Sequence, residues 1–323
     1  IAQGTVGDVE RSPHSLIAPF LASEHSQIVR PQTPADAMFS EGAIGIKTAP
    51  LHTVHALDAR VPKHRLTVVT GVSGSGKTTL VLESLVPALT AKIADEQMPE
   101  HVRALDAPGI ERVTMIDATP IGANVRSTVA TYSGVLDDLR RLFARTEAAK
   151  ARGPKAGAFS YNTGSLRCPT CDGTGQITLD VQFLPDVDID CPDCHGTRYS
   201  DEAGEITWEP KGGHAPVSLP DLLAMTVDEA REVFAGTSQR RLRAKLDTLH
   251  ELGIGYMTLG ESTPALSGGE AQRLKLASEM GRAQEGTLFV FDEPTIGLHP
   301  LDVRTLIGVF QKLIDQGASV LVI

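Results

Sequence analysis

The sequence predicts an α/β fold with a parallel sheet, interrupted by an α-rich insert. Three stretches of the 323-residue chain lead to this prediction. Residues 66–70 form an apolar and β-branched run that is followed by a glycine-rich loop and a helical pattern. Residues 288–291 form a second apolar run, which ends in two carboxylates. Between these runs, residues 168–194 hold all four cysteines of the chain, so the two halves of the sheet lie on either side of an insert.

The composition is that of a globular protein with room for two or three compact units, since 41% of the residues are hydrophobic. Thirty basic residues stand against forty acidic ones, which gives a formal net charge of −10. This balance excludes a uniformly basic nucleic-acid coat, so any contact with DNA must be local. No run approaches the roughly 18 apolar residues of a membrane span. A soluble, cytoplasmic protein without a membrane partner is therefore expected.

The two ends of the chain indicate a fragment of a longer protein. The chain begins with Ile1 instead of methionine, and residues 318–323 read as a buried strand at its very end. Residues 1–42 contain scattered prolines and no long periodic run, which predicts the tail of a preceding unit followed by a linker. From Ala43 onward, apolar residues recur at strand-like or hairpin-like spacings, so a globular domain is expected to begin there.

A phosphate-binding loop follows the first strand. Residues 71–78 read Gly-Val-Ser-Gly-Ser-Gly-Lys-Thr and are followed by a helix over 79–85, which fits G-x-x-x-x-G-K-[ST]. Glycines let backbone N–H groups wrap phosphates, Lys77 reaches the β and γ oxygens, and the Thr78 hydroxyl binds magnesium. A chance glycine-rich turn is the alternative, which the flanking strand and helix disfavour. The predicted nucleotide-binding residues of this loop are Gly71, Ser73, Gly74, Ser75, Gly76, Lys77, Thr78 and Thr79.

Two further motifs complete the predicted nucleotide chemistry. Residues 266–273 form a glycine turn that opens a helix, where Ser267 caps the first turn and Glu270 reaches back to the cap. Such a helix start favours a phosphate, although an ordinary loop-to-helix junction is as common. The apolar run 288–291 changes that balance, because Asp292 and Glu293 follow at the carboxyl end of a buried strand, where parallel sheets place ligands.

A basic segment follows a further strand over 113–117. A helix is expected near 134–149, and basic side chains crowd its end, with the aromatic residues Phe159 and Tyr161 just beyond. Basic side chains interleaved with aromatic rings suit a nucleic-acid backbone and exposed bases, but a solvated helix face is the commoner cause. The basic residues of this run are Arg140, Arg141, Arg145, Lys150, Arg152 and Lys155.

The cysteines form two C-x-x-C pairs, Cys168 with Cys171 and Cys191 with Cys194. Two such pairs fold back on each other as knuckles, and four thiolates complete a tetrahedral Zn²⁺ site. A pair of disulfides is the alternative, which a cytosolic chain disfavours. Four cysteines leave no position for a substrate water, so the metal is expected to be structural, with His195 a neighbour instead of a ligand. Beyond this module, Thr226 and Glu229 predict another capping box, and residues 240–252 a helix with a basic start.

The loop at 71–78, the glycine turn at 266–273 and the strand ending in Asp292 and Glu293 resemble, in this order, the Walker A, signature and Walker B motifs of an ABC-type ATPase. With the four-cysteine module between them, the chain is similar to the C-terminal half of the UvrA family of bacterial nucleotide excision repair. The resemblance covers nearly the whole chain. Its further pieces are residues 117–122, Arg126-Ser127, 130–132, the glycines and Arg198-Tyr199 of the cysteine module, 183–186, 274–277, 294–295 and 297–299.

The resemblance implies an ABC-type P-loop ATPase core with an inserted α-rich signature domain that carries a zinc module of four cysteines. The implied divisions are 1–42 (tail and linker), 43–120 (Walker A part of the core), 121–283 (signature domain, zinc module 168–194) and 284–323 (Walker B part). ATP, Mg²⁺ and structural Zn²⁺ are the implied cofactors. Implied partners are double-stranded DNA with lesions, a preceding N-terminal ATPase half, a second copy of the full-length protein and a UvrB-like helicase.

Residue roles follow from the same resemblance. Asp292 would orient magnesium through water, and Glu293 would act as general base in a DNA-dependent ATPase that recognises damage. Ser267, Gly268 and Gly269 would cap the γ-phosphate of a nucleotide held by another half, so the fragment alone is expected to be poorly active. Arg126 and Tyr132 would contribute to DNA binding with the zinc module.

The sequence departs from the family pattern in three places. Ala118 stands where the family usually has the Q-loop glutamine, Thr128-Val129 replaces an Asn-Pro, and the histidine expected after the last strand lies past Ile323. These changes suggest a divergent paralogue. One alternative function is therefore drug or genotoxin self-resistance. An ABC ATPase that powers export, with the zinc module as an accessory, is a second alternative, and a binding module without turnover, which Ala118 and the truncated end favour, is a third.

Overall fold

The computed structural model describes residues 3–15, 17–21, 34–122, 124–179, 187–210, 213–296, 298 and 300–323. The chain divides into two compact units, which we call the sheet unit (Ile1–Ala118 with Arg282–Ile323) and the insert unit (Thr119–Gly281). The segment 183–186, Gly297 and His299, which contribute to the family resemblance, lie outside the described residues.

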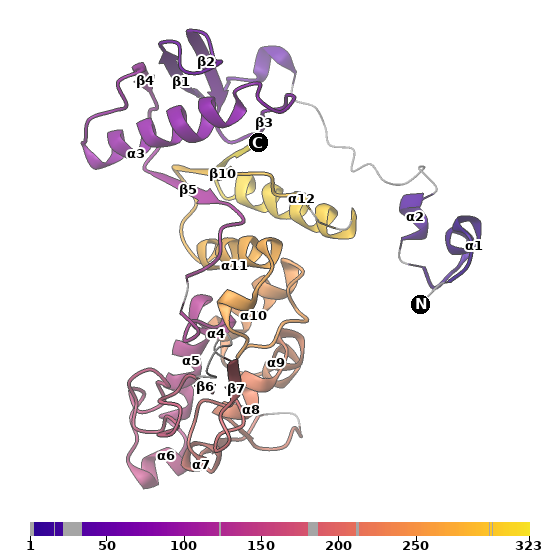
Figure 1. The fold of residues 1–323 in the computed structure, drawn as a ribbon, viewed down its shortest axis with the longest axis vertical. Helices are drawn as coiled ribbons and strands as arrows, with labels where there is room; N and C mark the ends of the chain where they lie inside the picture. The colour runs from indigo at the N-terminus through magenta and orange to yellow at the C-terminus, as the bar shows by residue number, and fades with distance from the viewer. Residues whose placement is uncertain are drawn as a thin grey trace. The chain divides into compact units, whose positions relative to one another are not determined.

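The sheet unit is built on a four-stranded parallel sheet of order β3-β11-β10-β5, of which β3, β5 and β10 are labelled in Figure 1. Its strands are β3 (Leu66–Val68), β5 (Arg112–Ile116), β10 (Thr287–Phe291) and β11 (Ser319–Val322). Phe291 on β10 is in register with Ile116 on β5 and with Val322 on β11. The carboxyl ends of the strands therefore meet at one edge, as a parallel sheet requires.

The predicted buried strands are confirmed at β10 and β11 but not at β3. Every residue of β10 is buried, and β11 is buried from Ser319 to Leu321. The predicted strand 66–70 is shorter than expected and partly exposed, with Val68 56% exposed. The reason is its place in the sheet, because β3 is an edge strand that pairs only with β11 among the described strands. The alternation of apolar residues cannot distinguish an edge strand from a central one.

The sheet unit also contains an antiparallel sheet, which is formed by strands from the first part of the chain. Its order is β2-β1-β4, with β1 (Ala43–Thr48), β2 (Leu57–Pro62) and β4 (Val102–Asp106). Strand β1 is the first strand of the described residues and begins at Ala43. One hydrophobic cluster joins Ile44 and Ile46 of this sheet to Leu288 and Val290 of β10.

The helix after the glycine-rich loop has an unusual first part. Residues Thr79–Leu85 form a π-helix, which continues into α3 (Val86–Ala94). The backbone N–H of Val86 donates to the carbonyl of Val81, five residues earlier. α3 packs against β4 and β5, whereas α12 (Pro300–Asp315) packs against β3 and β11. The other helices of this unit are α1 (Val6–Arg11), α2 (Ala18–Leu21) and the 3-10 turn Ala35–Ala37.

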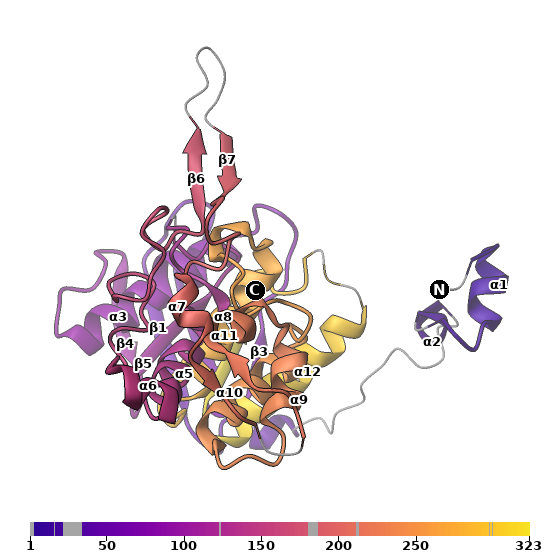
Figure 2. The same cartoon turned by 90° about the horizontal axis from the view of Figure 1, so that it is seen from below.

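The insert unit is mostly helical, as predicted. Its helices are α4 (Val129–Tyr132), α5 (Val135–Phe143), α6 (Glu147–Arg152), α7 (Asp201–Gly204), α8 (Leu219–Ala224), α9 (Val227–Phe234), α10 (Arg240–Glu251), the 3-10 turn Thr263–Ala265 and α11 (Gly268–Met280). Two short pairs of strands accompany them, β6 (Gln176–Leu179) with β7 (Val187–Asp190), and β8 (Thr207–Trp208) with β9 (Val217–Ser218). Figure 2 shows the β6-β7 hairpin extending away from the helices of its unit.

The expected single helix over 134–149 is wrong, because the chain forms α5 and α6 with a turn between them. Thr146 ends the first helix and starts the second. Its hydroxyl donates to the carbonyl of Phe143 at 2.9 Å and accepts from the N–H of Ala149 at 3.2 Å. A threonine that serves as an N-cap restarts a helix instead of continuing one.

Phe159 and Tyr161, the aromatic residues that follow the basic run, are fully buried, so neither ring is accessible to solvent. The hydroxyl of Tyr161 donates to the carbonyl of Arg126 at 3.0 Å, so this ring belongs to the core of the insert unit. These two rings are therefore unavailable for stacking on bases. Among the described helices, none is both long and apolar enough to cross a membrane.

Candidate nucleotide and metal sites

The glycine-rich loop lies directly after β3, at the carboxyl edge of the parallel sheet. Gly76 has a φ of +90°, and a Cβ there would lie 2.3 Å from the Cγ2 of Val54. Only glycine fits this position, because the backbone turns through the left-handed region against a neighbouring segment. Gly74 also has a positive φ, of +77°, and its carbonyl accepts from the hydroxyl of Thr53 at 3.3 Å.

The ammonium of Lys77 lies over this loop. It donates to the carbonyl oxygens of Gly71 at 3.0 Å and Val72 at 3.2 Å. The residues around it from Gly71 to Ser75 are exposed, and Thr78 is exposed at the start of the following helix. A positive charge, a helix start and exposed loop N–H groups together make a site that fits a chain of phosphates.

Three carboxylates gather at the same edge of the sheet. The N–H of Asp292 donates to the carbonyl of Ile116 at 3.2 Å, which places Asp292 beside Asp117. Burial, then the charge of Glu293, then that of Asp117 raise the pKa of Asp292 above its usual value. Mutual repulsion of this kind is relieved by a bound cation, and carboxylate oxygens are the ligands that magnesium prefers.

Glu293 has a strained backbone, with a φ of +45°. Its N–H donates to the carbonyl of Ile323 at 3.1 Å, so the end of β11 holds it in place. A glutamate in the left-handed region is uncommon, and such residues concentrate at functional sites.

The structure thus brings together two of the three predicted nucleotide motifs. The loop after β3 and the carboxylates after β10 share one edge of one sheet, with β11 between their strands. Sequence reasoning did not single out Asp117 as a site residue. Asp117 could have been identified from the sequence, because it stands at the end of a predicted strand, as Asp292 does.

The third motif, the glycine turn at Ser267, belongs to the insert unit. The predicted capping box is confirmed, since the hydroxyl of Ser267 accepts from the N–H of Glu270 at 3.4 Å, and Glu270 accepts from the N–H of Ser267 at 2.8 Å. Gly268 and Gly269 are the first residues of α11, whose N–H groups have no earlier carbonyl in the helix. The box predicted at Thr226 and Glu229 is likewise present, at the start of α9.

A tyrosine completes the cap of α11. The hydroxyl of Tyr256 donates to the second carboxylate oxygen of Glu270 at 2.5 Å. Burial opposes ionisation of Glu270, but the hydrogen bonds from Tyr256 and Ser267 outweigh it and lower its pKa. Glu270 is therefore ionised at neutral pH and holds the first turn of α11.

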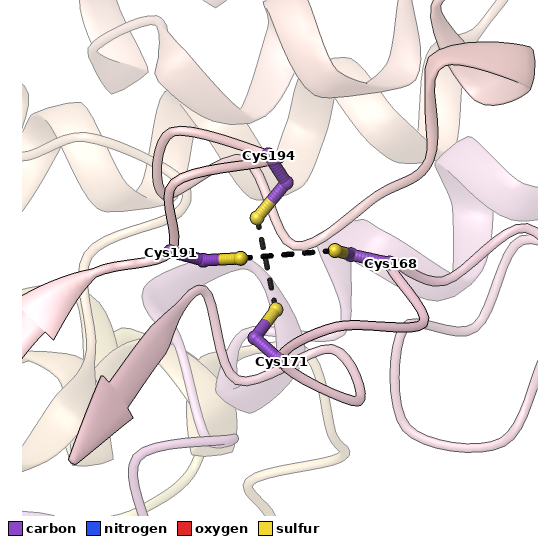
Figure 3. Close-up of side chains that lie close together, drawn as sticks. All are labelled: Cys168, Cys171, Cys191 and Cys194. Carbon is purple, nitrogen blue, oxygen red and sulfur yellow. Dashed lines mark hydrogen bonds between the residues drawn. The ribbon is translucent and has the colours of Figure 1, made fainter. Parts of the chain in front are cut away.

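The four cysteines converge on one point, as Figure 3 shows. All are buried and free, and their sulfurs lie within 4.8 Å of one another. The Sγ of Cys168 is 3.9 Å from that of Cys191, and the Sγ of Cys171 is 3.6 Å from that of Cys194. Zinc–sulfur bonds of about 2.3 Å in a tetrahedron place sulfurs about 3.8 Å apart. The donor set and its spacing therefore fit a zinc ion.

The two cysteine pairs have matching backbone turns. Asp172 and His195, each directly after the second cysteine of a pair, have φ of +52° and +48°. The following glycine is required in the first pair, since a Cβ on Gly173 would lie 1.8 Å from the carbonyl oxygen of Tyr161. The side chain of His195 is exposed and lies outside the cysteine cluster, as expected for a neighbour of the metal site.

Backbone N–H groups point at the sulfurs, as knuckles of this kind require. The N–H of Gly175 donates to the Sγ of Cys171 at 3.3 Å. Burial raises the pKa of Cys171, but the N–H groups of Gly175 and Gly173 and the neighbouring sulfurs outweigh it and lower that pKa to about 7. Burial instead raises the pKa of Cys168 and raises that of Cys194 to about 12, so Cys171 is the one of these three cysteines that ionises most readily to the thiolate form that binds a metal.

Arg126 joins this module to the rest of the insert unit. Its guanidinium donates to the carbonyl of Asp172 at 2.7 Å and to the carboxylate of Asp172 at 3.1 Å. Arg126, Tyr132 and Asn162 line one shallow cleft of about 300 Å³. The two residues expected at a DNA contact therefore lie together.

Comparison with known proteins gives a consistent result. UvrABC system protein A of Bacillus subtilis is 42% identical over 327 residues, which cover 100% of this chain and 33% of that protein. The protein of the same name from Thermus thermophilus is 40% identical over 327 residues, again 100% of this chain and 33% of the relative. The chain thus spans about a third of the length of the curated relatives it matches.

The solved structures agree with the sequences. The crystal structure of UvrA2 from Deinococcus radiodurans superposes with a TM-score of 0.83 at 42% identity, covering 98% of this chain and 37% of that one. No protein-family model matches the chain. The α/β fold with a parallel sheet and an insert that carries four clustered cysteines is confirmed.

Proposed function

Because this chain is a homologue of the UvrA proteins along its whole length, we propose that it binds and hydrolyses ATP as part of a DNA-damage-recognition subunit of nucleotide excision repair. The observation that carries this proposal is the pairing of motifs. The sheet unit holds a phosphate loop and three carboxylates at one edge, and the insert unit holds a helix start suited to phosphate and a four-cysteine cluster.

In this proposal the sheet unit holds one nucleotide with magnesium. Loop N–H groups and the ammonium of Lys77 would bind the phosphates, and the hydroxyl of Thr78 and the carboxylate of Asp292 would hold the magnesium ion, which would offset negative charge on the phosphates. Glu293 accepts the proton of the attacking water. The hydrogen bond from the N–H of Glu293 to the carbonyl of Ile323 fixes the backbone of this residue. The other residues that bind the nucleotide in this proposal are Gly71, Ser73, Gly74, Ser75, Gly76 and Thr79.

The insert unit supplies the other half of a shared site. Ser267, Gly268 and Gly269 donate to the γ-phosphate of a nucleotide bound by another ATPase unit, with Glu270 fixing the turn. A single chain then owns one loop and the cap for a different nucleotide. The partners that follow are a preceding ATPase half and a second copy of the whole protein.

The DNA side of the proposal rests on the insert unit. A zinc ion held by Cys168, Cys171, Cys191 and Cys194 would fix the two knuckles, and Arg126 is anchored to the first knuckle through Asp172. Arg126 and Tyr132 line a cleft and present a cation and an aromatic ring to duplex DNA with a lesion. A UvrB-like helicase then receives the recognised site.

The alanine at position 118 favours a second function. The family's glutamine at this position is replaced by a side chain that cannot hydrogen-bond, at the end of β5. A UvrA-like ATPase serving drug or genotoxin self-resistance would tolerate looser coupling between ATP and DNA.

Equilibrium DNA binding separates the two functions. Fluorescence anisotropy with a duplex of about 30 base pairs, with and without one bulky adduct, is measured in the presence of a non-hydrolysable ATP analogue. Damage recognition predicts tighter binding of the adduct duplex, by about 10-fold or more, the scale of about 1.4 kcal/mol. Equal affinity for both duplexes would contradict a damage-recognition role, and binding of neither would contradict a DNA function altogether.

A further inference from the structure

Two basic stretches that are far apart in the sequence meet at one cleft of the insert unit. The cleft has a volume of about 280 Å³ and lies between α5 and the start of α10. Its floor is apolar, since Leu142 and Leu242 are buried. Its rim carries four arginines, which we call the arginine cleft: Arg141, Arg145, Arg240 and Arg241.

The charges in this cleft are unbalanced. Asp138 is the one carboxylate among the lining residues, and its side chain is 11% exposed. It is shared by three cations, at 3.0 Å from Arg141, 2.7 Å from Lys245 and 3.8 Å from Arg241. Arg145 and Arg240 are exposed and have no carboxylate partner in the described parts of the chain. Four arginines and one acid therefore line the cleft, in a chain whose net charge is −10.

The first turn of α10 adds to the positive potential. Helix α10 spans 12 residues from Arg240, and its N-cap, Gln239, makes no side-chain hydrogen bond to the first turn. The N–H groups of a helix start have no carbonyl within the helix and favour an anion. Four guanidinium groups beside them offer paired N–H donors that match phosphate oxygens.

The size and chemistry of the cleft select the anion. With a volume of about 280 Å³, the cleft is at the lower end of the range that holds a small-molecule ligand, about 300–1,000 Å³. Successive phosphates of a nucleic-acid backbone each need one or two cations and little enclosed volume. Arginines on two elements match a row of phosphates better than one compact anion.

We propose that the arginine cleft binds backbone phosphates of the DNA that the insert unit contacts, at a place separate from the cleft of Arg126 and Tyr132. This inference rests on the proposed DNA function and adds a second point of contact to it. Contacts to phosphates position a protein on DNA without reading its sequence, so the cleft would act equally on damaged and undamaged duplex.

The test removes the two arginines that have no carboxylate partner among the described residues. The double variant Arg145→Gln/Arg240→Gln largely keeps side-chain size and removes two charges, while Asp138 keeps its three cations. The matched control, Lys92→Gln/Arg103→Gln, removes two charges from exposed side chains of the sheet unit. All four positions are exposed, so both variants are expected to melt within about 2 °C of the wild type.

Anisotropy of a labelled undamaged duplex is measured with the 323-residue chain over a series of salt concentrations. The cleft variant is expected to bind about 10-fold or more weakly at low salt, and the slope of log K against log salt to become shallower by about 1.8, or about 0.9 for each lost phosphate contact. The control is expected to keep the wild-type slope.

The outcomes separate the two proposals. A cleft variant with the affinity and slope of the control would overturn the arginine cleft and leave the DNA function standing. A wild-type chain that binds no duplex at any salt concentration would overturn the DNA function and the cleft with it.

Discussion

The ammonium of Lys77 lies 3.0 Å from the carbonyl oxygen of Gly71, across the mouth of the glycine-rich loop. The two residues lie near opposite ends of the loop, so the charge sits where a chain of phosphates would enter. A second hydrogen bond, to Val72 at 3.2 Å, keeps the ammonium within reach of the loop. This relationship gives the first prediction.

Lys77→Ala is expected to weaken binding of a fluorescent ATP analogue by at least about 10-fold, because a charge-assisted contact to phosphate contributes about 1.5–3 kcal/mol. Lys92→Ala, which removes an exposed lysine from α3, serves as control and should bind like the wild type. Unchanged affinity of Lys77→Ala would remove this loop from the nucleotide site.

Glu293→Gln is expected to bind ATP normally and to hydrolyse it at least about 100-fold more slowly, the usual scale for a lost general base. The amide keeps the length of the side chain, and the N–H that donates to Ile323 is unaffected. Single-turnover hydrolysis with saturating protein measures the chemical step. Normal rates in the variant would assign the base to another residue.

Asp292→Asn is expected to stabilise the protein at pH 7 without magnesium or nucleotide. Burial and the charges of Glu293 and Asp117 raise the pKa of Asp292, so the ionised form is disfavoured in the folded state. Ionised Asp292 therefore lowers the free energy of unfolding at any pH above its raised pKa. This loss of stability disappears as the pH falls through the raised pKa towards the usual value of about 3.9.

Differential scanning calorimetry in EDTA measures this effect. The melting temperature of Asp292→Asn is expected to exceed that of the wild type by about 1 °C or more at pH 7 and to converge with it near pH 4. A lower melting temperature for the variant at pH 7 would show that the three carboxylates do not repel one another.

Much of the sheet unit could be predicted because its information is local. The run 288–291 is apolar on both faces and is followed by two acids, which fixes a central parallel strand and the edge where ligands bind. The same reasoning predicted a strand longer than β3, because edge strands and central strands have similar amino-acid compositions. Its exposure depends on which strands pair with it.

The insert unit was harder to predict because its features depend on distant segments. Phe159 and Tyr161 follow a basic run, but tertiary packing buries both rings. The arginines at the end of α5 and the start of α10 were visible separately in the sequence. Their meeting at one cleft required the packing of these two helices.

The chain is expected to contain one zinc ion, held by Cys168, Cys171, Cys191 and Cys194. Cys191→Ser should lose the metal and lower the melting temperature, because a structural zinc contributes folding free energy. His195→Ala is the matched control and should keep its zinc, since the histidine side chain is exposed outside the cluster. Elemental analysis of reduced protein checks both variants, and a wild type without metal would refute the site.

The cap at Ser267 and the loop at Lys77 belong to different units of the chain. In the proposed function they serve different nucleotides, so hydrolysis needs donors from two ATPase units at once. One chain by itself is then expected to bind ATP weakly and to hydrolyse it very slowly.

Steady-state ATP hydrolysis over a dilution series of the 323-residue chain, with and without a lesion-containing duplex, tests this account most directly. The account predicts scarcely any turnover at low concentration, a rate that rises with the square of the concentration as two chains complete each other's sites, and a change in that rate when the damaged duplex is added. Robust turnover that is proportional to concentration and identical with and without the duplex would contradict it.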